Sequence, residues 1–359
     1  MLNALPFVSV VIPMRNEAGH IRRCIESVLA QDYPLDRLEV VVVDGASDDD
    51  SVAVVQACGP RVRVLHNPRG IVPTAMNIGI RAARGAVIAR VDAHTVLAPD
   101  FVRLGVETLQ RTGADNVGGP MRSVGGGATG DAVARAMSSR FGIGSYFHFA
   151  TADREVDTVY MGMYPRRVFE RIGLFDEELV RNQDDELNYR LRKAGGRVFL
   201  TTGMHSEYQN RQSLRSLARQ FFQYGLWKVR VLQKHPRQMS PRHFVPPAFV
   251  AALGAGALLG PSSPTIAWCW LGLVGLYTAA LVAATATVRG AGGAAGCARI
   301  MAAFATMHVA WGAGVLVGLV RFAPRWFVAE PPPPSLPLVA LGADQSARPP
   351  TGTSPGRTS

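Results

Sequence analysis

The chain has 359 residues, 48% of them hydrophobic, and a formal net charge of +11. That length accommodates one large domain and an appendage. Its cysteines have neither paired nor metal-type spacing, which argues against a disulfide framework or a cysteine-based metal cluster. The opening residues, MLNALPFVSVVIP, carry no basic leader and look like a first strand rather than a signal peptide. We therefore expect residues 1 to about 240 to lie in the cytoplasm.

The first 120 residues alternate strand-like and helix-like patterns. Expected strands cover 7–13, 38–44, 62–66, 86–91 and 114–120. Expected helices cover 17–31, 71–84 and 97–111, with a further helix from Asp50. This alternation predicts an α/β domain with a mostly parallel, Rossmann-like sheet and helices on both faces.

Polar or conformationally special residues follow three of these strands. They are Pro13, Arg15 and Glu17 after the first, Asp44 at the end of the second, and Asp92 and His94 after the fourth. Open sheets of this kind bind ligands at the carboxyl ends of their strands, so these residues are expected on one rim. Acidic groups gathered there repel each other unless a cation or a donor lies between them.

Asp92 and His94 are two residues apart, so on an extended segment their side chains point to the same side. Both can ligate a divalent cation. The carboxylate suits Mg²⁺ or Mn²⁺, and the imidazole shifts the preference toward Mn²⁺ or another transition metal. The alternative is that both residues cap the helix that follows.

Three stretches resemble family 2 glycosyltransferases, which have the GT-A fold: VSVVIPMRNE at 8–17, VVVDGASDDDS at 41–51 and NPRGIVPTAMNIGIRAARG at 67–85. The resemblance runs from about Phe7 to Trp227 and is greatest to the succinoglycan glucosyltransferases of exopolysaccharide assembly. It implies a nucleotide-sugar donor whose base is contacted by Asp44, with Arg15 and Glu17 nearby. Asp92-Ala93-His94 replaces the family's usual Asp-x-Asp, which leaves the identity of the metal open.

The resemblance continues on the acceptor side. Residues 162–179 are similar to the family's acceptor segment, and NQDDELNYRLRK aligns with Glu-Asp-x-(Asp/Glu)-Leu-x-x-Arg, which places the family arginine at Arg190. That alignment implies Asp184 as the general base, with Asp185 second; the alternative is a plain solvated helix start. Near the position of the Gln-x-x-Arg-Trp motif of processive members, the chain has Gln220, Gln223 and Tyr224. Because the motif is not intact, we expect single-sugar addition.

The remainder of the chain predicts a membrane anchor. Residues 209–242 are basic and carry no acid, which fits an interfacial helix on anionic lipids better than a nucleic-acid site. Uncharged runs within 243–321 predict three transmembrane helices at about 244–260, 265–288 and 300–320; buried core helices are the alternative. Three spans would place the C-terminus outside, against which Arg321 and Arg325 argue. Residues 329–359 are expected to be disordered.

Together these features predict a GT-A domain at 1–208 in a multi-pass protein of the cell membrane. The expected enzyme is an inverting glycosyltransferase that moves a hexose from a nucleotide-diphosphate sugar, UDP-linked, to a lipid-linked saccharide. One alternative is a polyprenyl-phosphate sugar synthase. Another is a non-catalytic membrane scaffold that binds sugar nucleotides.

Overall fold

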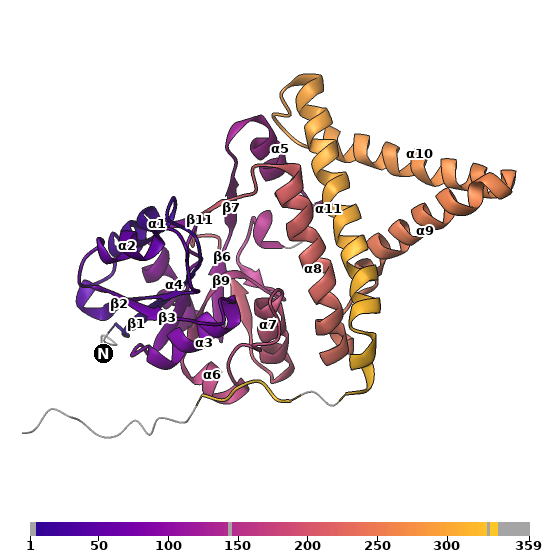
Figure 1. The fold of residues 1–359 in the computed structure, drawn as a ribbon. Coiled ribbons are helices and arrows are strands. Elements are labelled where there is room, and N and C mark those ends of the chain that lie inside the picture. Colours follow the sequence, from indigo (N-terminus) through magenta and orange to yellow (C-terminus); the bar gives the residue numbers. More distant parts are fainter. Residues whose placement is uncertain (1–4, 143–145, 329–330, 337–359) are drawn as a thin grey trace, which may run out of the picture.

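The computed structural model describes residues 5–142, 146–328 and 331–336. Figure 1 shows an α/β domain on one side, two long helices side by side next to it, and a helical hairpin that projects beyond them. The domain contains an eight-stranded sheet in the order β3-β2-β1-β4-β9-β6-β10-β8. A smaller sheet has the order β5-β11-β7.

The strands of the large sheet come from both halves of the domain. They are β1 (Val8–Met14), β2 (Leu38–Asp44), β3 (Val62–His66), β4 (Val87–Arg90), β6 (Asn116–Gly119), β8 (Arg154–Glu155), β9 (Tyr160–Pro165) and β10 (Val198–Leu200). The first four are parallel, and β9 runs antiparallel between β4 and β6. All residues of β1, β2 and β4 are buried, as their continuous apolar runs predict.

Helices cover both faces of this sheet. They are α1 (Ile21–Leu29), α2 (Ser51–Gln56), α3 (Val72–Ala82), α4 (Phe101–Thr112), α6 (Arg167–Ile172) and α7 (Gln183–Lys193). The helix α5 (Gly127–Met137) lies apart from them and packs against β7 of the smaller sheet and a long C-terminal helix. The helices α1, α2 and α4 pack on one face, and α3, α6 and α7 pack on the other. In α1 the buried residues Ile21, Cys24, Ile25 and Val28 follow the helical repeat. The predicted α/β architecture is confirmed.

One local prediction is wrong. The helix expected from residue 97 begins at Phe101, because Thr95–Leu97 forms β5 of the smaller sheet. Its partner β11 (Ser206–Gln209) lies more than a hundred residues later and also pairs with β7 (Met121–Val124). Local periodicity cannot detect such a pairing.

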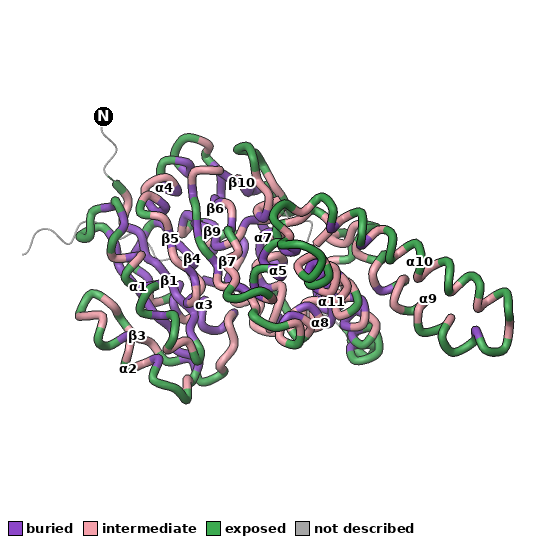
Figure 2. Tube along the Cα trace, turned by 90° about the horizontal axis from the view of Figure 1, so that it is seen from above, coloured by how far each residue is buried: buried purple, intermediate pink, exposed green. Residues whose placement is uncertain are grey.

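Four helices follow the α/β domain: α8 (Leu214–Lys234), α9 (Val245–Leu259), α10 (Pro264–Ala286) and α11 (Gly293–Arg321). The segments 241–262, 264–286 and 293–321 are long and apolar enough to span a membrane, which confirms the three expected apolar helices. The third begins at Gly293 rather than near residue 300. In Figure 2 the hairpin of α9 and α10 is largely exposed, whereas the sheet is buried.

The contacts of α8 differ from those expected of a helix lying on a membrane. Its apolar face packs against α11, and the packing is close: a Cβ added at Gly225 would come within 2.1 Å of Trp311 O. Lys228 and Arg230 are buried.

The start of the tail also differs from the disorder expected for 329–359. Pro334 O accepts a 2.7 Å hydrogen bond from Leu174 N, and Leu336 is buried against the α/β domain. The rest of the tail lies outside the described residues.

Candidate active site

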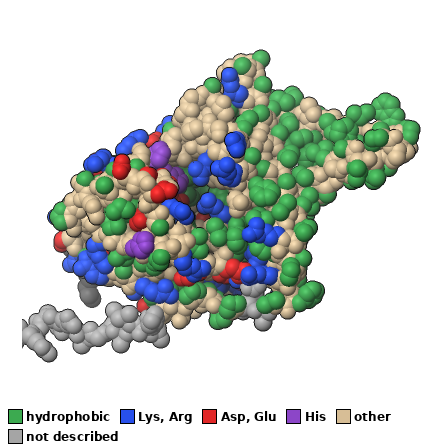
Figure 3. All heavy atoms as spheres, viewed as in Figure 1, with side chains coloured by type: hydrophobic (Ala, Val, Ile, Leu, Met, Phe, Trp, Pro, Cys, Tyr) green, Lys and Arg blue, Asp and Glu red, His purple; other side chains and the backbone are tan. Residues whose placement is uncertain are grey.

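A cavity of about 1840 Å³ lies where the strand ends meet α7, α8 and the C-terminal helices. In Figure 3 it appears as a hollow beside which lysine and arginine side chains gather. Its lining includes nine of the predicted site residues: Pro13, Arg15, Glu17, Asp92, His94, Asp184, Asp185, Gln220 and Tyr224. Asp44, Arg190 and Gln223 do not line it. Residues more than two hundred positions apart in the sequence therefore converge on one site.

The loops after β1 and β2 brace each other at one end of the cavity. Asp44 accepts a 2.6 Å hydrogen bond from Ser47 Oγ, and the neighbouring Gly45 lines the cavity. Ser47 Oγ in turn accepts from Asn16 N at 2.9 Å, and Asn16 has a positive φ of 56°. These contacts fix the turn that carries Arg15 and Glu17.

Arg90, at the end of β4, separates two of the acidic groups. Its Nε lies 2.9 Å from Asp92 Oδ1, and its Nη1 lies 3.5 Å from Asp184 Oδ2. Burial alone would raise the pKa of Asp92, but Arg90 and His94 outweigh it, and the pKa of Asp92 lies below its ordinary value. The acidic groups on the rim were expected to repel each other unless a cation lay between them, and Arg90 is such a cation. The sequence analysis missed it, although an arginine within the apolar run AVIARV is a visible signal.

His94 is held by two contacts. Its Nδ1 lies 2.9 Å from Glu17 Oε1, and its ring packs edge-on against Tyr208, with 5.0 Å between the centroids. The segment after His94 is strand β5, so neither Asp92 nor His94 caps a helix. Among the described residues, no group of three or more His, Cys, Asp or Glu side chains is placed to hold a metal ion. Asp92 and His94 offer one carboxylate and one imidazole, a donor set that fits a divalent cation shared with a phosphate ligand.

The two candidate bases at the start of α7 have different surroundings. The Asp184 side chain is 39% exposed and faces Arg90. Asp185 instead forms an ion pair with the buried Lys228 of α8, and its backbone carbonyl accepts from Gln238 Nε2 at 3.1 Å. Asp184 thus faces the strand ends, whereas Asp185 is tied to the helix behind it.

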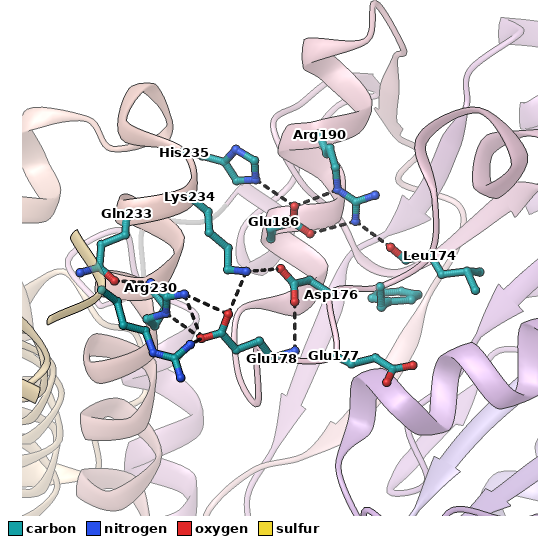
Figure 4. Close-up of polar contacts among 12 residues, drawn as sticks. Leu174, Asp176, Glu177, Glu178, Glu186, Arg190, Arg230, Gln233, Lys234 and His235 are labelled. Atoms are coloured by element: carbon teal, nitrogen blue, oxygen red, sulfur yellow. Dashed lines mark hydrogen bonds and ion pairs between the residues drawn. The ribbon is translucent and has the colours of Figure 1, made fainter. Parts of the chain in front are cut away.

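Arg190 does not reach the acceptor side of the cavity. Its guanidinium donates to Glu186, at 2.8 Å to Oε1, and to the backbone carbonyl of Leu174 (Figure 4). It also donates to the backbone carbonyl of Ile172. Glu186 is further paired with His235, 2.9 Å away. Arg190 therefore braces α7 against the turn after α6. This role is structural, although the resemblance placed Arg190 in the family's acceptor-side motif.

The remaining predicted residues lie on α8. Gln220 Nε2 donates to Tyr224 Oη at 2.8 Å, and both side chains line the cavity. Gln223 Oε1 accepts from Trp227 Nε1 at 3.2 Å and lies outside the lining. The Gln223 side chain is directed along α8 toward Trp227, one turn further on, and not into the cavity.

A second ion-pair cluster joins α8 to the segment before α7 (Figure 4). Glu178 pairs with three cations: Arg230, Lys234 and Arg325. Burial raises the pKa of Glu178, but hydrogen bonds from Arg230 and Lys234 prevail and bring it to about 2. The same lysine lies 2.8 Å from Asp176. These cations of α8 were expected to face lipid headgroups, but they contact acids of the α/β domain instead.

Comparison with known proteins agrees with this geometry. Residues 9–173 match the sequence profile of Glycosyl transferase family 2. The chain is 32% identical over 323 residues to the succinoglycan biosynthesis protein ExoA of Rhizobium meliloti (strain 1021), covering 88% of this chain and 96% of that protein. It is also 28% identical over 239 residues to a dolichyl N-acetyl-alpha-D-glucosaminyl phosphate 3-beta-D-2,3-diacetamido-2,3-dideoxy-beta-D-glucuronosyltransferase of Methanococcus voltae, covering 64% of this chain and 74% of that protein.

Among solved structures, the mannosyltransferase PcManGT from Pyrobaculum calidifontis, in complex with GDP-Man and Mn²⁺, superposes with a TM-score of 0.56. The match covers 88% of both chains at 20% identity, and it confirms the GT-A fold. The sequence matches thus identify a glycosyltransferase, and its long apolar helices indicate membrane association. The chain belongs to glycosyl transferase family 2.

Proposed function

We propose that this enzyme transfers a hexose, with inversion, from a UDP-linked sugar to a lipid-linked saccharide, and that Asp184 is the general base. The observation that carries the proposal is the placement of Asp92 and Asp184 on either side of Arg90 in one cavity. A donor held at the strand ends would meet an acceptor hydroxyl held at α7.

The donor would lie along the loops after β1 and β2. Arg15, Glu17 and Asp44 would hold the nucleoside, with Pro13 in the wall. Asp92 and His94 would hold a divalent cation, Mn²⁺ or Mg²⁺, which would neutralise charge on the leaving diphosphate. A protein of similar fold supports a cation of this kind, since the Pyrobaculum mannosyltransferase was solved with Mn²⁺.

Transfer forms a bond between the acceptor oxygen and the anomeric carbon as the bond from that carbon to the diphosphate oxygen breaks. Asp184 takes the proton of the attacking hydroxyl, and the diphosphate leaves with the bonding electron pair. The partly exposed Asp184 suits this task better than Asp185, whose carboxylate is paired with Lys228.

The wall of the cavity supports a lipid-linked acceptor. Phe249, Tyr277 and Trp311 of the apolar helices line it. Besides Arg15 and Arg90, six further arginines line it, and guanidinium groups suit phosphate: Arg140, Arg181, Arg192, Arg211, Arg237 and Arg242. These cations line a concave site, which favours a small anionic ligand over nucleic acid. The same helices support a location at the cell membrane, with the domain in the cytoplasm and anionic lipids around the anchor.

The test compares Asp184→Asn with Asp185→Asn. We expect Asp184→Asn to lower kcat by about 10²–10⁴-fold, the usual contribution of a general base, while calorimetry shows unchanged donor binding. Asp185→Asn should retain most of the activity. The reverse ranking would assign the base to Asp185, and activity retained by both variants would contradict the mechanism.

Product analysis separates the remaining alternatives. Thin-layer chromatography of labelled lipid should show a product that keeps its sugar in mild acid. An acid-labile lipid monophosphate sugar would instead identify a polyprenyl-phosphate sugar synthase. Failure of the wild-type protein to turn over any nucleotide sugar would favour the scaffold.

A further inference from the structure

The three apolar helices are packed in different ways. In the most apolar stretches of α9 and α10 only 6% of the residues are buried, against 44% for α11. The difference arises because α8 covers one side of α11. A Cβ at Gly314 would come within 2.1 Å of Phe222 O, so the two helices touch at the backbone.

Both ends of α11 are fastened to the α/β domain. Just before its first turn, Arg135 of α5 donates to Arg289 O at 2.8 Å, and within the helix His308 Nε2 lies 2.9 Å from Phe141 O. Just after its last turn, Arg325 pairs with Glu178 of the α/β domain, and Gln233 Nε2 of α8 adds a 2.8 Å hydrogen bond to Phe322 O.

This fastening is incompatible with a crossing of the membrane by α11. A helix of 29 residues is about 43 Å long, whereas the hydrocarbon core is about 30 Å thick. A spanning helix of that length would have its ends in opposite aqueous phases. Contacts at both ends with one water-soluble domain require both ends to lie on the same side.

The hairpin of α9 and α10 has the opposite character. Figure 1 shows it projecting away from α11, and Figure 3 shows it covered with hydrophobic side chains. From His243 to Val288 it carries no Asp, Glu, Lys or Arg, and Trp268 and Leu258 are 73% and 79% exposed. Basic residues flank its base, with Arg242 before α9 and Arg289 after α10. A hairpin without charged residues, flanked by an arginine at each end, fits a bilayer with anionic headgroups.

The side of α11 that α8 leaves open is also apolar. Val309, Val317 and Val320 are at least 39% exposed. Trp326 and Phe327, just beyond the helix, are 42% and 96% exposed, as expected of aromatic side chains at the headgroup level. This surface would rest against the lipid beside the base of the hairpin.

We propose that the chain enters the membrane only with the α9–α10 hairpin, and that α11 lies along the membrane-facing side of the α/β domain. The membrane is then crossed an even number of times, not three. Residues 331–336 lie on the same side as the catalytic domain, which accounts for the hydrogen bond from Leu174 N to Pro334 O. The inference does not depend on the transfer chemistry, so either can fail without the other.

Cysteine labelling distinguishes the two arrangements. In a variant whose four native cysteines are replaced by serine, Ala294→Cys marks the exposed first turn of α11 and Ser335→Cys marks the chain beyond it. A membrane-impermeant maleimide should label both positions in inside-out vesicles and neither in intact spheroplasts. Labelling of the two positions from opposite sides would overturn the proposal, because a spanning α11 requires it.

A second measurement does not depend on the cysteine variants. The wild-type chain fused at its C-terminus to green fluorescent protein should fluoresce, and the matching alkaline phosphatase fusion should be inactive. The reverse pair of results would place the C-terminus outside. After an alkaline carbonate wash the protein should stay with the membrane. Release as a soluble oligomer would mean that a second copy of the chain, not lipid, covers the α9–α10 hairpin.

Discussion

The two ion-pair clusters differ in how many cations contact each acidic side chain. At the cavity, Asp92 and Asp184 share the single guanidinium of Arg90, and Asp184 remains 39% exposed. Away from the cavity, Glu178 has three cationic partners: Arg230, Lys234 and Arg325. An acidic side chain that shares one cation with a second acid keeps oxygen lone pairs with which it can bind a ligand or accept a proton. An acid surrounded by cations has no such capacity and instead holds two segments together.

Among changes to the contacts within these two clusters, the largest expected effect comes from removing the shared cation. Arg90→Gln would leave Asp92 and Asp184 without the charge between them, and both carboxylates would shift. Since a displacement of about 1 Å at a reacting group can cost about 100-fold in rate, we expect kcat to fall by that order. Arg90→Lys should recover part of kcat. Equal loss in both variants, measured by steady-state kinetics, would mean that charge between the acids is not what matters.

The other cluster should respond in stability rather than in rate. Glu178→Gln removes the charge that the fully buried Arg230 contacts, and breaking such a pair costs roughly 3 kcal/mol of unfolding free energy. Glu177→Gln is the matched control, because its partner Arg69 is 56% exposed and such surface pairs contribute about 1 kcal/mol or less. Urea unfolding in detergent measures both. Equal effects would show that the cluster has no special structural role.

Acid should weaken the same cluster. The pKa of Glu178 is about 2 in the folded protein against an ordinary value of 4.5, so the folded state favours the ionised form. Its contribution to stability is complete above pH 4.5 and is lost as the pH falls from there toward 2. The wild-type protein should therefore lose more stability than Glu178→Gln between pH 5 and pH 3. Parallel curves for the two proteins would contradict this.

The smallest effect is expected at the contact that orients His94. Glu17 Oε1 lies 2.9 Å from its Nδ1, and the loss of such a partner typically lowers metal affinity about 10–100-fold. We expect the lower end for Glu17→Gln, since the amide can still form a hydrogen bond. The readout is the Mn²⁺ concentration that gives half-maximal activity. No change would indicate that His94 does not bind the metal.

Local sequence was sufficient to predict the strands and helices and most of the residues at the carboxyl ends of the strands. The continuous apolar run of β2 predicts a buried strand, and the helical spacing of apolar residues in α1 predicts a helix. Burial produces a different spacing of apolar residues in strands and in helices. The acids at the strand ends could be placed together because parallel strands end at one edge. The NQDDEL segment located the two candidate bases, since its residues are contiguous.

Tertiary structure alone decided which charges pair and which helices touch. Glu178 meets Arg230 and Arg325 across 52 and 147 residues, and no local pattern encodes a contact at such a separation. The same holds for the contacts of Arg190 with the backbone carbonyls of Ile172 and Leu174, whereas its pairing with Glu186, four residues earlier on α7, is of a kind that local sequence can indicate. Composition made α11 apolar, but its contacts with α8 and the α/β domain determined how it lies, because a helix long enough to cross a membrane can also cover a protein surface.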